Sequence, residues 1–553
     1  MRREPDPMTR TFIVTATPPT PNGDFHVGHL SGPYLGADIF ARYQRMCGNR
    51  VRYVCSADRN QSYVVTTAER LGKNPDRLAT ACHGEMRQTL EAADIRMDAF
   101  NMVDGEHVAF VQSFLAKVEA NGHAVRKPWR FPYSVAEDRY LFESFVSGHC
   151  PVCWSPTAGA ICEACGHPND TRTLELVSSS RSAGDIDYRE VEIAVLELER
   201  FRSEFTAFYE SKRGIWRPHV VEFAFEMLSR PLPDYPLTYP SDWGIPAPFT
   251  GLEGQVVNVW AEMLPGLVNS TRIAEGEKAT GDGSETGLWS PRRQAELVEF
   301  LGYDNSFFFT FVHPALAWAH GDCRIVDTIL TNEFFELENF KFSTSKGHLI
   351  WARDLLRERD VNAVRFYLAL ANPEYQKMNF TQSAMDELVE VRLSRPYREA
   401  ASGILEAAAA LGLSGQRWRI DEQTAARLGG VLARFARFHE IETFSPQRIA
   451  EHLSQLLVRI AAGSRHALSP RLARAEAIEE VRYLAGLFQL VLPLVTRPLM
   501  PAFSDRLGEA FARTATDTWP ASLAGQECQI EAATYDQALA AWVDQQPALR
   551  RAS

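Results

Sequence analysis

Two short stretches of this chain combine residue types that could bind and activate a polyphosphate. His26-Val27-Gly28-His29 places two imidazoles beside a glycine, and 339–348 reads NFKFSTSKGH, with two lysines and two serines. Imidazole N–H groups donate to phosphate oxygens, and lysines stabilise charge that develops on a leaving phosphate. Each stretch alone also has a plain explanation, a chance match for the first and a solvated basic loop for the second. Together they predict a triphosphate clamp built from His26, His29, Lys341, Ser343, Ser345 and Lys346.

The elements that must position the two histidines can be read on either side of them. Residues 11–15 form a short β-branched run typical of a strand, and 30–47 has the apolar spacing of a helix. The histidines therefore fall at a strand-to-helix crossover, where free N–H groups and the positive dipole end of a helix attract an anion. Gly28 permits close approach of a base or backbone. The sequence thus predicts a phosphate site at the first crossover.

Four of the nine cysteines lie close together in the sequence. Cys150-x2-Cys153 is followed after eight residues by Cys162-x2-Cys165. Each turn can present two thiolates to one ion, so the four together predict a tetrahedral, structural zinc site with no open position. Four reduced thiols or two disulfides are the alternatives, and the scattered remaining cysteines argue against a secreted disulfide framework.

Length and composition describe a multidomain globular chain. It has 553 residues, of which 45% are hydrophobic and 23% charged, and its formal net charge is -12. This charge neither supports nor excludes a local basic surface for tRNA, and DNA is not an expected partner. The N-terminus lacks the apolar core of a signal peptide, and the apolar run 484–495 is too short to span a membrane. We expect a soluble, cytoplasmic protein without a membrane partner.

The motifs, taken in order, resemble the class I aminoacyl-tRNA synthetases, most closely the methionyl-tRNA synthetase family. His26-Val27-Gly28-His29, the cysteine cluster and the lysine loop near 341 carry this resemblance. It extends through most of the chain, over the segments 36–58, 180–192, 229–230, 242–248, 256–260, 302–305, 360–370 and 489–511. The resemblance implies an enzyme, an ATP-dependent ligase that forms an aminoacyl-adenylate.

The family resemblance also implies an architecture. The fold class is α/β, a class I synthetase Rossmann fold with a parallel sheet and a zinc-knuckle insertion, followed by an all-α helical bundle. The implied boundaries are the first Rossmann half at 1–115, the connective insertion at 116–225, the second Rossmann half at 226–330, the lysine-loop segment at 331–372, and the anticodon-binding-like helical domain at 373–553. The Ala-, Leu-, Arg- and Glu-rich spacing after Gln382 supports the helical domain independently.

Site residues follow from the resemblance by position. Catalysis is implied for His26, His29, Lys341 and Lys346, and ATP binding for Gly28, Gly302, Asp304, Ser343 and Ser345. Amino-acid binding is implied for Thr17, Pro18, Asp58, Trp260, Leu267, Phe309 and His313. Asp58 matches the position that takes the α-ammonium, and a carboxylate is a strong partner for that charge in a closed site. The implied cofactors are ATP, Mg²⁺ and structural Zn²⁺.

Several positions depart from the family pattern. Thr344 replaces the second lysine of the loop, although Lys341 and Lys346 remain, so we expect adenylation to be kept. Leu267 and Phe309 stand where the family holds the methionine thioether with a tyrosine and a histidine. A histidine, His313, replaces a family tryptophan. The loss of both polar partners predicts an α-amino acid other than methionine.

The segments expected to read the anticodon depart as well. Residues 385–404 and 458–468 lack the asparagine, arginine and tryptophan pattern of the family, and base readout needs such stacking and edge contacts. We therefore expect acyl transfer to a small amine or hydroxylamine in specialised metabolism, with a true tRNA ligase as the alternative. A non-catalytic tRNA-binding module is a third hypothesis. The amino acid, the acceptor and the oligomeric state stay open at this point.

Overall fold

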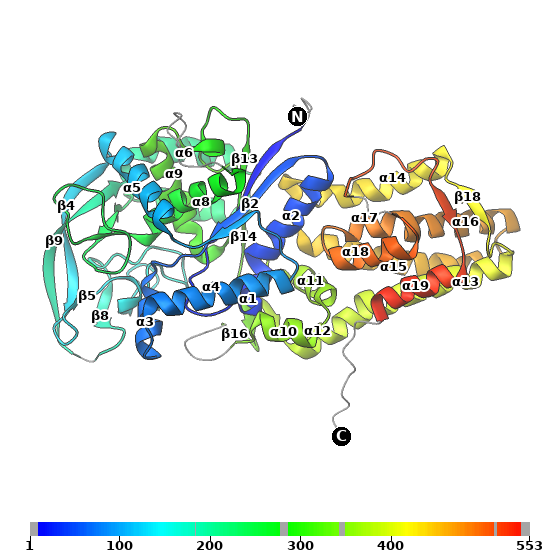
Figure 1. Cartoon of the computed structure of the whole chain (residues 1–553), viewed down its shortest axis with the longest axis horizontal. Coiled ribbons are helices and arrows are strands. Elements are labelled where there is room, and N and C mark those ends of the chain that lie inside the picture. The colour runs from blue at the N-terminus through cyan, green and yellow to red at the C-terminus, as the bar shows by residue number, and fades with distance from the viewer. Residues whose placement is uncertain (1–8, 183, 277–285, 342–348, 514–516, 544–553) are drawn as a thin grey trace, which may run out of the picture.

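The computed structural model describes residues 9–182, 184–276, 286–341, 349–513 and 517–543. Figure 1 shows an α/β part at one end of the long axis and a helical part at the other. The predicted site residues Ser343, Ser345 and Lys346 lie outside the described residues. For Lys341 the structure describes the backbone only, at the end of a short strand.

A parallel sheet forms the centre of the α/β part. Its strands run in the order β14-β13-β1-β2-β3. The bounds are β1 (Thr11–Ala16), β2 (Arg50–Ser56), β3 (Ala99–Asn101), β13 (Glu296–Gly302) and β14 (Thr328–Asn332). The chain passes from β1 to β2 and β3 on one side, and only later to β13 and β14 on the other. This change of direction leaves a crevice at the carboxyl ends of β1 and β13, where doubly wound sheets bind ligands.

Each face of the sheet is buried by its own helices. Phe12 and Val14 of β1 belong to one apolar cluster, and Ile13 belongs to the other, as the alternation along a strand requires. The helices of this part are α1 (Val27–His29), α2 (Leu35–Met46), α3 (Ser62–Arg70), α4 (Pro75–Ala92), α5 (Gly105–Ala120), α8 (Val259–Glu275) and α9 (His313–His320). The strand expected at 11–15 is therefore confirmed.

The helix expected from residue 30 onward is interrupted. A π-helical turn covers Leu30–Tyr34 between α1 and α2, and Gly32 has ψ −116°, outside the helical range. Pro33 follows, and a proline both disfavours helical geometry in the residue before it and lacks an N–H. A Cβ at Gly32 would lie 2.8 Å from the side chain of Asn332. The kink therefore lets the helix pass the carboxyl end of β14.

A largely antiparallel insertion follows the first half of the sheet. Its long ribbon pairs β4 (Ala124–Ser134) with β9 (Ile186–Glu197), flanked by β5 (Arg139–Tyr140) and β10 (Asp234–Pro236). A smaller sheet of β6 (Val146–His149), β7 (Pro156–Ala158) and β8 (Glu175–Ser179) carries the cysteines. Helices α6 (Arg202–Lys212) and α7 (Pro218–Leu228) and the pair β11 (Thr238–Tyr239) and β12 (Val256–Val257) lead back to the main sheet.

A short segment connects the sheet to the helical part. It contains β15 (Phe335–Leu337), β16 (Phe340–Lys341), β17 (Met378–Phe380), α10 (Ala352–Glu358) and α11 (Val361–Leu370). Arg365 of α11 forms a buried ion pair with Asp38 of α2 at 2.7 Å and donates to the carbonyls of Ala93 and Leu499. One side chain thus ties α2, α4 and the helical part together.

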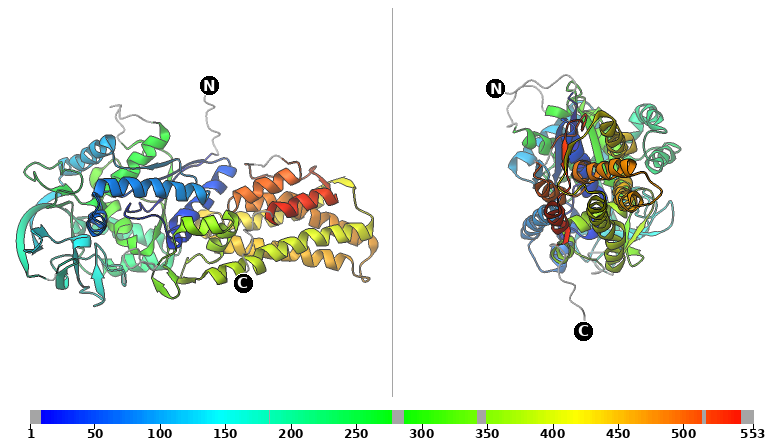
Figure 2. Two further views of the ribbon diagram at one scale, coloured as in Figure 1. Left: turned by 60° about the horizontal axis from the view of Figure 1, so that its bottom comes forward. Right: turned by 90° about the vertical axis from the view of Figure 1, so that its right-hand side faces the viewer.

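The C-terminal part is a helical bundle (Figure 2). Its elements are α12 (Gln382–Val389), α13 (Arg395–Leu411), β18 (Arg417–Arg419), α14 (Glu422–Arg437), α15 (Pro446–Ala467), α16 (Arg474–Gly486), α17 (Leu492–Thr496), α18 (Pro501–Ala510), β19 (Glu527–Gln529) and α19 (Ala532–Val543). The α/β class with a helical C-terminal region is as predicted. Over the described ranges, no helix is long and apolar enough to cross a membrane.

Candidate active site

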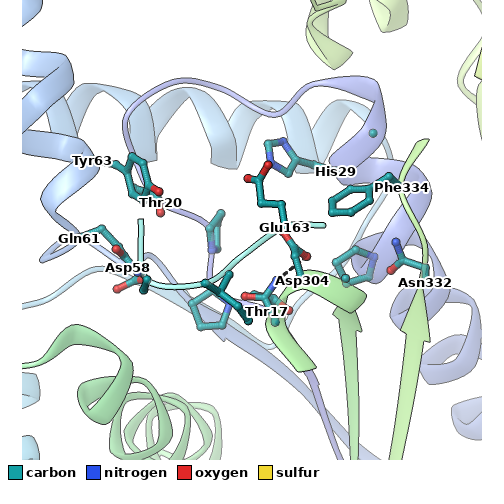
Figure 3. A pocket seen from close by; sticks show the side chains of 18 of the residues that line it. Thr17, Thr20, His29, Asp58, Gln61, Tyr63, Glu163, Asp304, Asn332 and Phe334 are labelled. Carbon is teal, nitrogen blue, oxygen red and sulfur yellow. Dashed lines mark hydrogen bonds between the residues drawn. The ribbon is translucent and has the colours of Figure 1, made fainter. Parts of the chain in front are cut away.

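A cavity of about 360 Å³ opens at the carboxyl ends of β1 and β13. Figure 3 shows Asp58, Gln61, Tyr63 and Thr20 gathered at one end of it and His29, Phe334 and Asn332 at the other, with Glu163 and Asp304 between them. Nine of the predicted site residues line this cavity: Thr17, Pro18, His26, Gly28, His29, Asp58, Trp260, Gly302 and Asp304. The crevice at the change of strand direction therefore brings together the histidine turn, Asp58 and the Gly302–Asp304 segment.

The two histidines hold one another at the start of α1. Their rings stack with centroids 3.7 Å apart. The backbone N–H of His26 donates to Nδ1 of His29, and the N–H of His29 donates to Nδ1 of His26, both at 3.3 Å. Because each Nδ1 accepts a hydrogen bond, each neutral ring carries its hydrogen on Nε2. The turn thus sets two imidazole donors side by side at the cavity.

The residues that follow the lysine loop in the sequence contact the histidine turn. The N–H of Val27 donates to the carbonyl of Ile350 at 3.1 Å, and His26 forms a β-bridge with Trp351. On the near side, Phe335 of β15 lines the cavity, and β15 pairs with β16, which ends at Lys341. The C-terminal flank of the lysine loop is therefore anchored at the histidine turn, and its N-terminal flank pairs with a strand that lines the same cavity.

Gly302 and Asp304 form another part of the cavity wall, just past β13. A Cβ at position 302 would lie 2.7 Å from Oδ1 of Asp304, so a side chain there would require the Asp304 carboxylate to move. Asp304 Oδ1 also accepts a hydrogen bond from Nδ2 of Asn305 at 3.0 Å. The glycine thus allows the carboxylate to fold back over the end of its own strand.

Asp58 lies at the opposite end from the histidines and is 7% exposed. Its N–H donates to the carbonyl of Pro19 at 2.9 Å, which joins the loops after β1 and β2. Burial raises the pKa of the Asp58 carboxyl well above its usual value, and the charges of Glu262 and Glu143 raise it further. Among the residues the structure describes, no cation pairs with it. A substrate ammonium would supply the missing charge and lower that pKa.

A second buried group supports the wall behind Asp58. Glu262 of α8 lies 2.9 Å from Nε2 of His107 and accepts two hydrogen bonds, at 2.8 and 3.0 Å, from Nδ2 of Asn60. Both partners in the His107–Glu262 pair are almost fully buried. The pair fixes Asn60 and with it the loop that carries Asp58.

The predicted amino-acid wall does not line the cavity as a unit. Trp260 does, and its indole stacks on Phe308 with centroids 3.7 Å apart. Leu267 and Phe309 are fully buried and His313 is 3% exposed, and none of these three contributes to the cavity surface. Neither ring nitrogen of His313 has a hydrogen-bond partner in the described part of the chain. Burial lowers the pKa of His313 to about 3, so its ring is neutral at pH 7.

The four cysteines meet at one point, as the spacing predicts. Their sulfur atoms all lie within 4.8 Å of one another, with the Cys150–Cys165 pair at 3.7 Å and the Cys153–Cys162 pair at 3.6 Å. A tetrahedral zinc shell with Zn–S bonds of about 2.3 Å requires sulfur atoms about 3.8 Å apart. The four thiols therefore fit a zinc ion with a closed shell, and these sulfur distances do not fit disulfides.

The cysteine cluster also reaches the cavity. Ala158, Ala160, Ile161 and Glu163 line it, and all four belong to the strand and turn that carry Cys162. Glu163 lies between Cys162 and Cys165 in the sequence, and its side chain points into the middle of the cavity in Figure 3. The cysteine spacing predicts a metal site but gives no sign that the same turn forms a cavity wall.

Sequence reasoning missed several lining residues. Gln61, Tyr63, Glu163, Asn332 and Phe334 line the cavity and were not predicted. A signal existed for two of them, because Asn332 and Phe334 stand at and just after the carboxyl end of a strand in a doubly wound sheet. Gln61 and Tyr63 follow Asp58 closely in the chain, and that proximity was the only hint.

Comparisons with known proteins show the family of the chain. The family model described as "tRNA synthetases class I (M)" matches residues 12–400. A methionine–tRNA ligase of Roseiflexus sp. (strain RS-1) is 31% identical over 72% of this chain and 69% of its own length. One of Picrophilus torridus is 28% identical over 70% of this chain and 56% of its own length.

Solved structures share the fold. The Mycobacterium tuberculosis methionyl-tRNA synthetase in complex with methionyl-adenylate superposes with a TM-score of 0.71 at 18% identity, covering 94% of this chain and 98% of that one. Its free form superposes with a TM-score of 0.67. Because the identity is low, this likeness supports the architecture and not the details of the cavity.

Proposed function

Since the chain belongs to the methionyl type of the class I aminoacyl-tRNA synthetases, we propose that it activates an α-amino acid with ATP to form an aminoacyl-adenylate. One observation carries the proposal: a single cavity is lined by His26, Gly28 and His29, by Asp58, and by Gly302 and Asp304. A phosphate-binding turn and an ammonium-binding carboxylate at opposite ends of one crevice suit a reaction between a triphosphate and an amino acid (Figure 3).

The reaction assigns a role to each end. The amino-acid carboxylate attacks the α-phosphorus, a carboxyl-oxygen–phosphorus bond forms, and the bond to the pyrophosphate oxygen breaks, so that its electron pair leaves with pyrophosphate. The Nε2–H groups of His26 and His29 donate to oxygens that gain charge during this step. Lys341 and Lys346 supply positive charge to the leaving pyrophosphate, with Ser343 and Ser345 ordering their loop. Asp58 holds the α-ammonium and so directs the carboxylate toward the phosphorus.

Two ions complete the proposal. Mg²⁺ bound to ATP would neutralise part of the charge on the phosphates. Zn²⁺ is held by Cys150, Cys153, Cys162 and Cys165 and is structural, since four protein ligands leave no open position.

For the acceptor we infer tRNA. The relatives reported above are named methionine–tRNA ligases, which supports tRNA transfer over transfer to a small amine or hydroxylamine. Methionine is therefore the first amino acid to test. A different amino acid is the second candidate. It rests only on the family positions of Leu267 and Phe309, which lack the polar groups with which the family holds a thioether, since neither residue lines the cavity.

The decisive experiment is ATP–pyrophosphate exchange with each of the twenty amino acids, followed by addition of total tRNA to the best one. Amino-acid-dependent exchange is expected, with the acyl group then recovered on tRNA. Exchange without acylation of tRNA would favour the small-amine acceptor. No exchange with any amino acid would exclude the activation chemistry.

A further inference from the structure

Gln61 stands next to Asp58 at the ammonium end of the cavity and has an unused acceptor. It is the residue that precedes α3 (Ser62–Arg70), it lines the cavity, and it is 2% exposed. Its Nε2 donates to Oδ2 of Asp58 at 2.8 Å. Its Oε1 is buried and has no hydrogen-bond partner in the part of the chain that the structure describes.

The contact with Asp58 fixes which way this amide points. Asp58 must be ionised to pair with an ammonium, and an ionised carboxylate only accepts hydrogen bonds, so the amide atom facing it is then the NH₂ group and the other is the oxygen. The amide oxygen therefore lies on the same planar group as a nitrogen bound to Asp58, a few ångströms from that carboxylate. An orphaned buried acceptor costs free energy unless a ligand satisfies it.

We propose that Gln61 Oε1 accepts a hydrogen bond from the substrate α-ammonium, so that Asp58 and Gln61 together form the ammonium site. An ammonium carries up to three N–H donors and a carboxylate uses only one or two of them at good geometry. The amide oxygen takes another, and the amide nitrogen keeps the carboxylate oriented. This inference rests on the proposed function, since it assumes that an amino acid occupies the cavity.

The ammonium site separates substrates by their α-substituent. An α-hydroxy acid brings one donor and no charge, so it satisfies at most one of the two acceptors and leaves the other buried and unpaired. Sites built around polar groups reject ligands that leave them unpaired. Gln61 thus contributes to selection of α-amino acids over α-hydroxy acids, whatever their side chain.

The test compares Gln61→Met, which keeps the length of the side chain but loses both polar atoms, with Gln61→Glu, which keeps an acceptor oxygen. The probes are L-methionine, or the amino acid selected by the exchange screen, and the corresponding α-hydroxy acid. We expect Gln61→Met to raise KM for the amino acid about 10- to 100-fold, the scale of a hydrogen bond to a charged group. KM for ATP stays unchanged, and discrimination against the α-hydroxy acid falls. Gln61→Glu keeps an acceptor but replaces the donor to Asp58 by a second carboxyl group. Its KM for the amino acid is therefore expected to approach the wild-type value only at low pH, where the two carboxyl groups share a proton.

A pH profile separates this role from a purely positioning one. The amide N–H of Gln61 lowers the pKa of Asp58, so a residue acting only through Asp58 would shift the acid limb of the profile and leave the plateau unchanged. The proposal instead requires a raised amino-acid KM on the plateau, where Asp58 is ionised in every variant. Thr66→Ala, one turn further along α3 and outside the cavity, is the control. If wild type supports exchange and Gln61→Met keeps its plateau KM, the inference fails while the proposed function stands. If wild type supports no exchange, the proposed function itself fails.

Discussion

The two ends of the cavity are built in different ways. At the imidazole end, a backbone turn supplies the geometry, because reciprocal N–H to Nδ1 bonds hold His26 and His29. At the ammonium end, buried acidic side chains supply it, with Asp58 close to Glu262 and Glu143. At the first end the two imidazole rings hold one another, whereas at the second no cation among the described residues balances Asp58. We conclude that the ammonium end depends more strongly on its substrate.

Among the variants that test this difference between the two ends, Asp58→Asn should lower activity most. Loss of the only proposed charge partner of the ammonium is expected to lower kcat/KM for the amino acid about 10³-fold, the scale of breaking a buried ion pair. The measurement is pyrophosphate exchange at saturating ATP. Asp76→Asn, the same substitution at an exposed carboxylate that pairs with Arg59, is the control and should leave the rate near wild type. Equal rates in both variants would remove Asp58 from the site.

Asp58→Asn should also change the stability of the protein. The pKa of Asp58 is higher in the folded than in the unfolded chain, so the folded state holds the proton more tightly and its stability falls as pH rises through that interval. Asp58→Asn removes this loss. Its unfolding temperature at pH 7, without substrate, should therefore exceed that of wild type, with the difference shrinking toward pH 4. A lower unfolding temperature at pH 7 would show that Asp58 stabilises the empty protein.

At the imidazole end, His29→Ala should lower the rate of adenylation about 10²- to 10³-fold, as expected for loss of one transition-state donor. Lys341→Ala is expected to have an effect of the same size. The fall should appear in kcat, with KM for the amino acid little changed, because the donor acts on the phosphate. His466→Ala, an exposed histidine in α15, is the control. Near-wild-type exchange in both His29→Ala and Lys341→Ala would place the phosphate site elsewhere.

The two ends also differ in how far sequence could predict them. The histidine turn, the strand before it and the four cysteines follow local rules, since a few neighbouring residues determine each one. Gln61 and Glu163 enter the cavity because of how separate elements pack, which no local pattern reports. The interrupted helix at 30–34 is intermediate: the Gly32–Pro33 pair signals a break, but the reason for it, the approach of Asn332, is a long-range contact. Similarly, Leu267, Phe309 and His313 match family positions and yet stand apart from the cavity surface.

Loss of zinc should disturb the cavity wall between the two ends. Cys162→Ser, or chelation, is expected to lower the unfolding temperature and to raise KM for ATP roughly tenfold, because the cysteine turn also places Ala160, Ile161 and Glu163 in the wall. Metal analysis of wild type should give one zinc per chain. Cys47→Ser, at an exposed cysteine outside the cluster, is the control. An unchanged KM for ATP in the zinc-free protein would separate the metal site from the cavity.

The smallest effect on activity is expected for His313→Leu. His313 packs against Phe309, with ring centroids 4.4 Å apart, and neither of its nitrogens has a hydrogen-bond partner among the described residues. A buried polar group without a hydrogen bond costs about 1–3 kcal/mol, so replacing it by an apolar side chain of similar size should raise the free energy of unfolding. Because His313 does not line the cavity, exchange should stay within about twofold of wild type. Thermal unfolding and exchange kinetics of the same preparation measure both effects. A large rise in the amino-acid KM would show instead that the substrate side chain opens the buried wall and reaches His313, which would make the two ends of the cavity equally dependent on ligand.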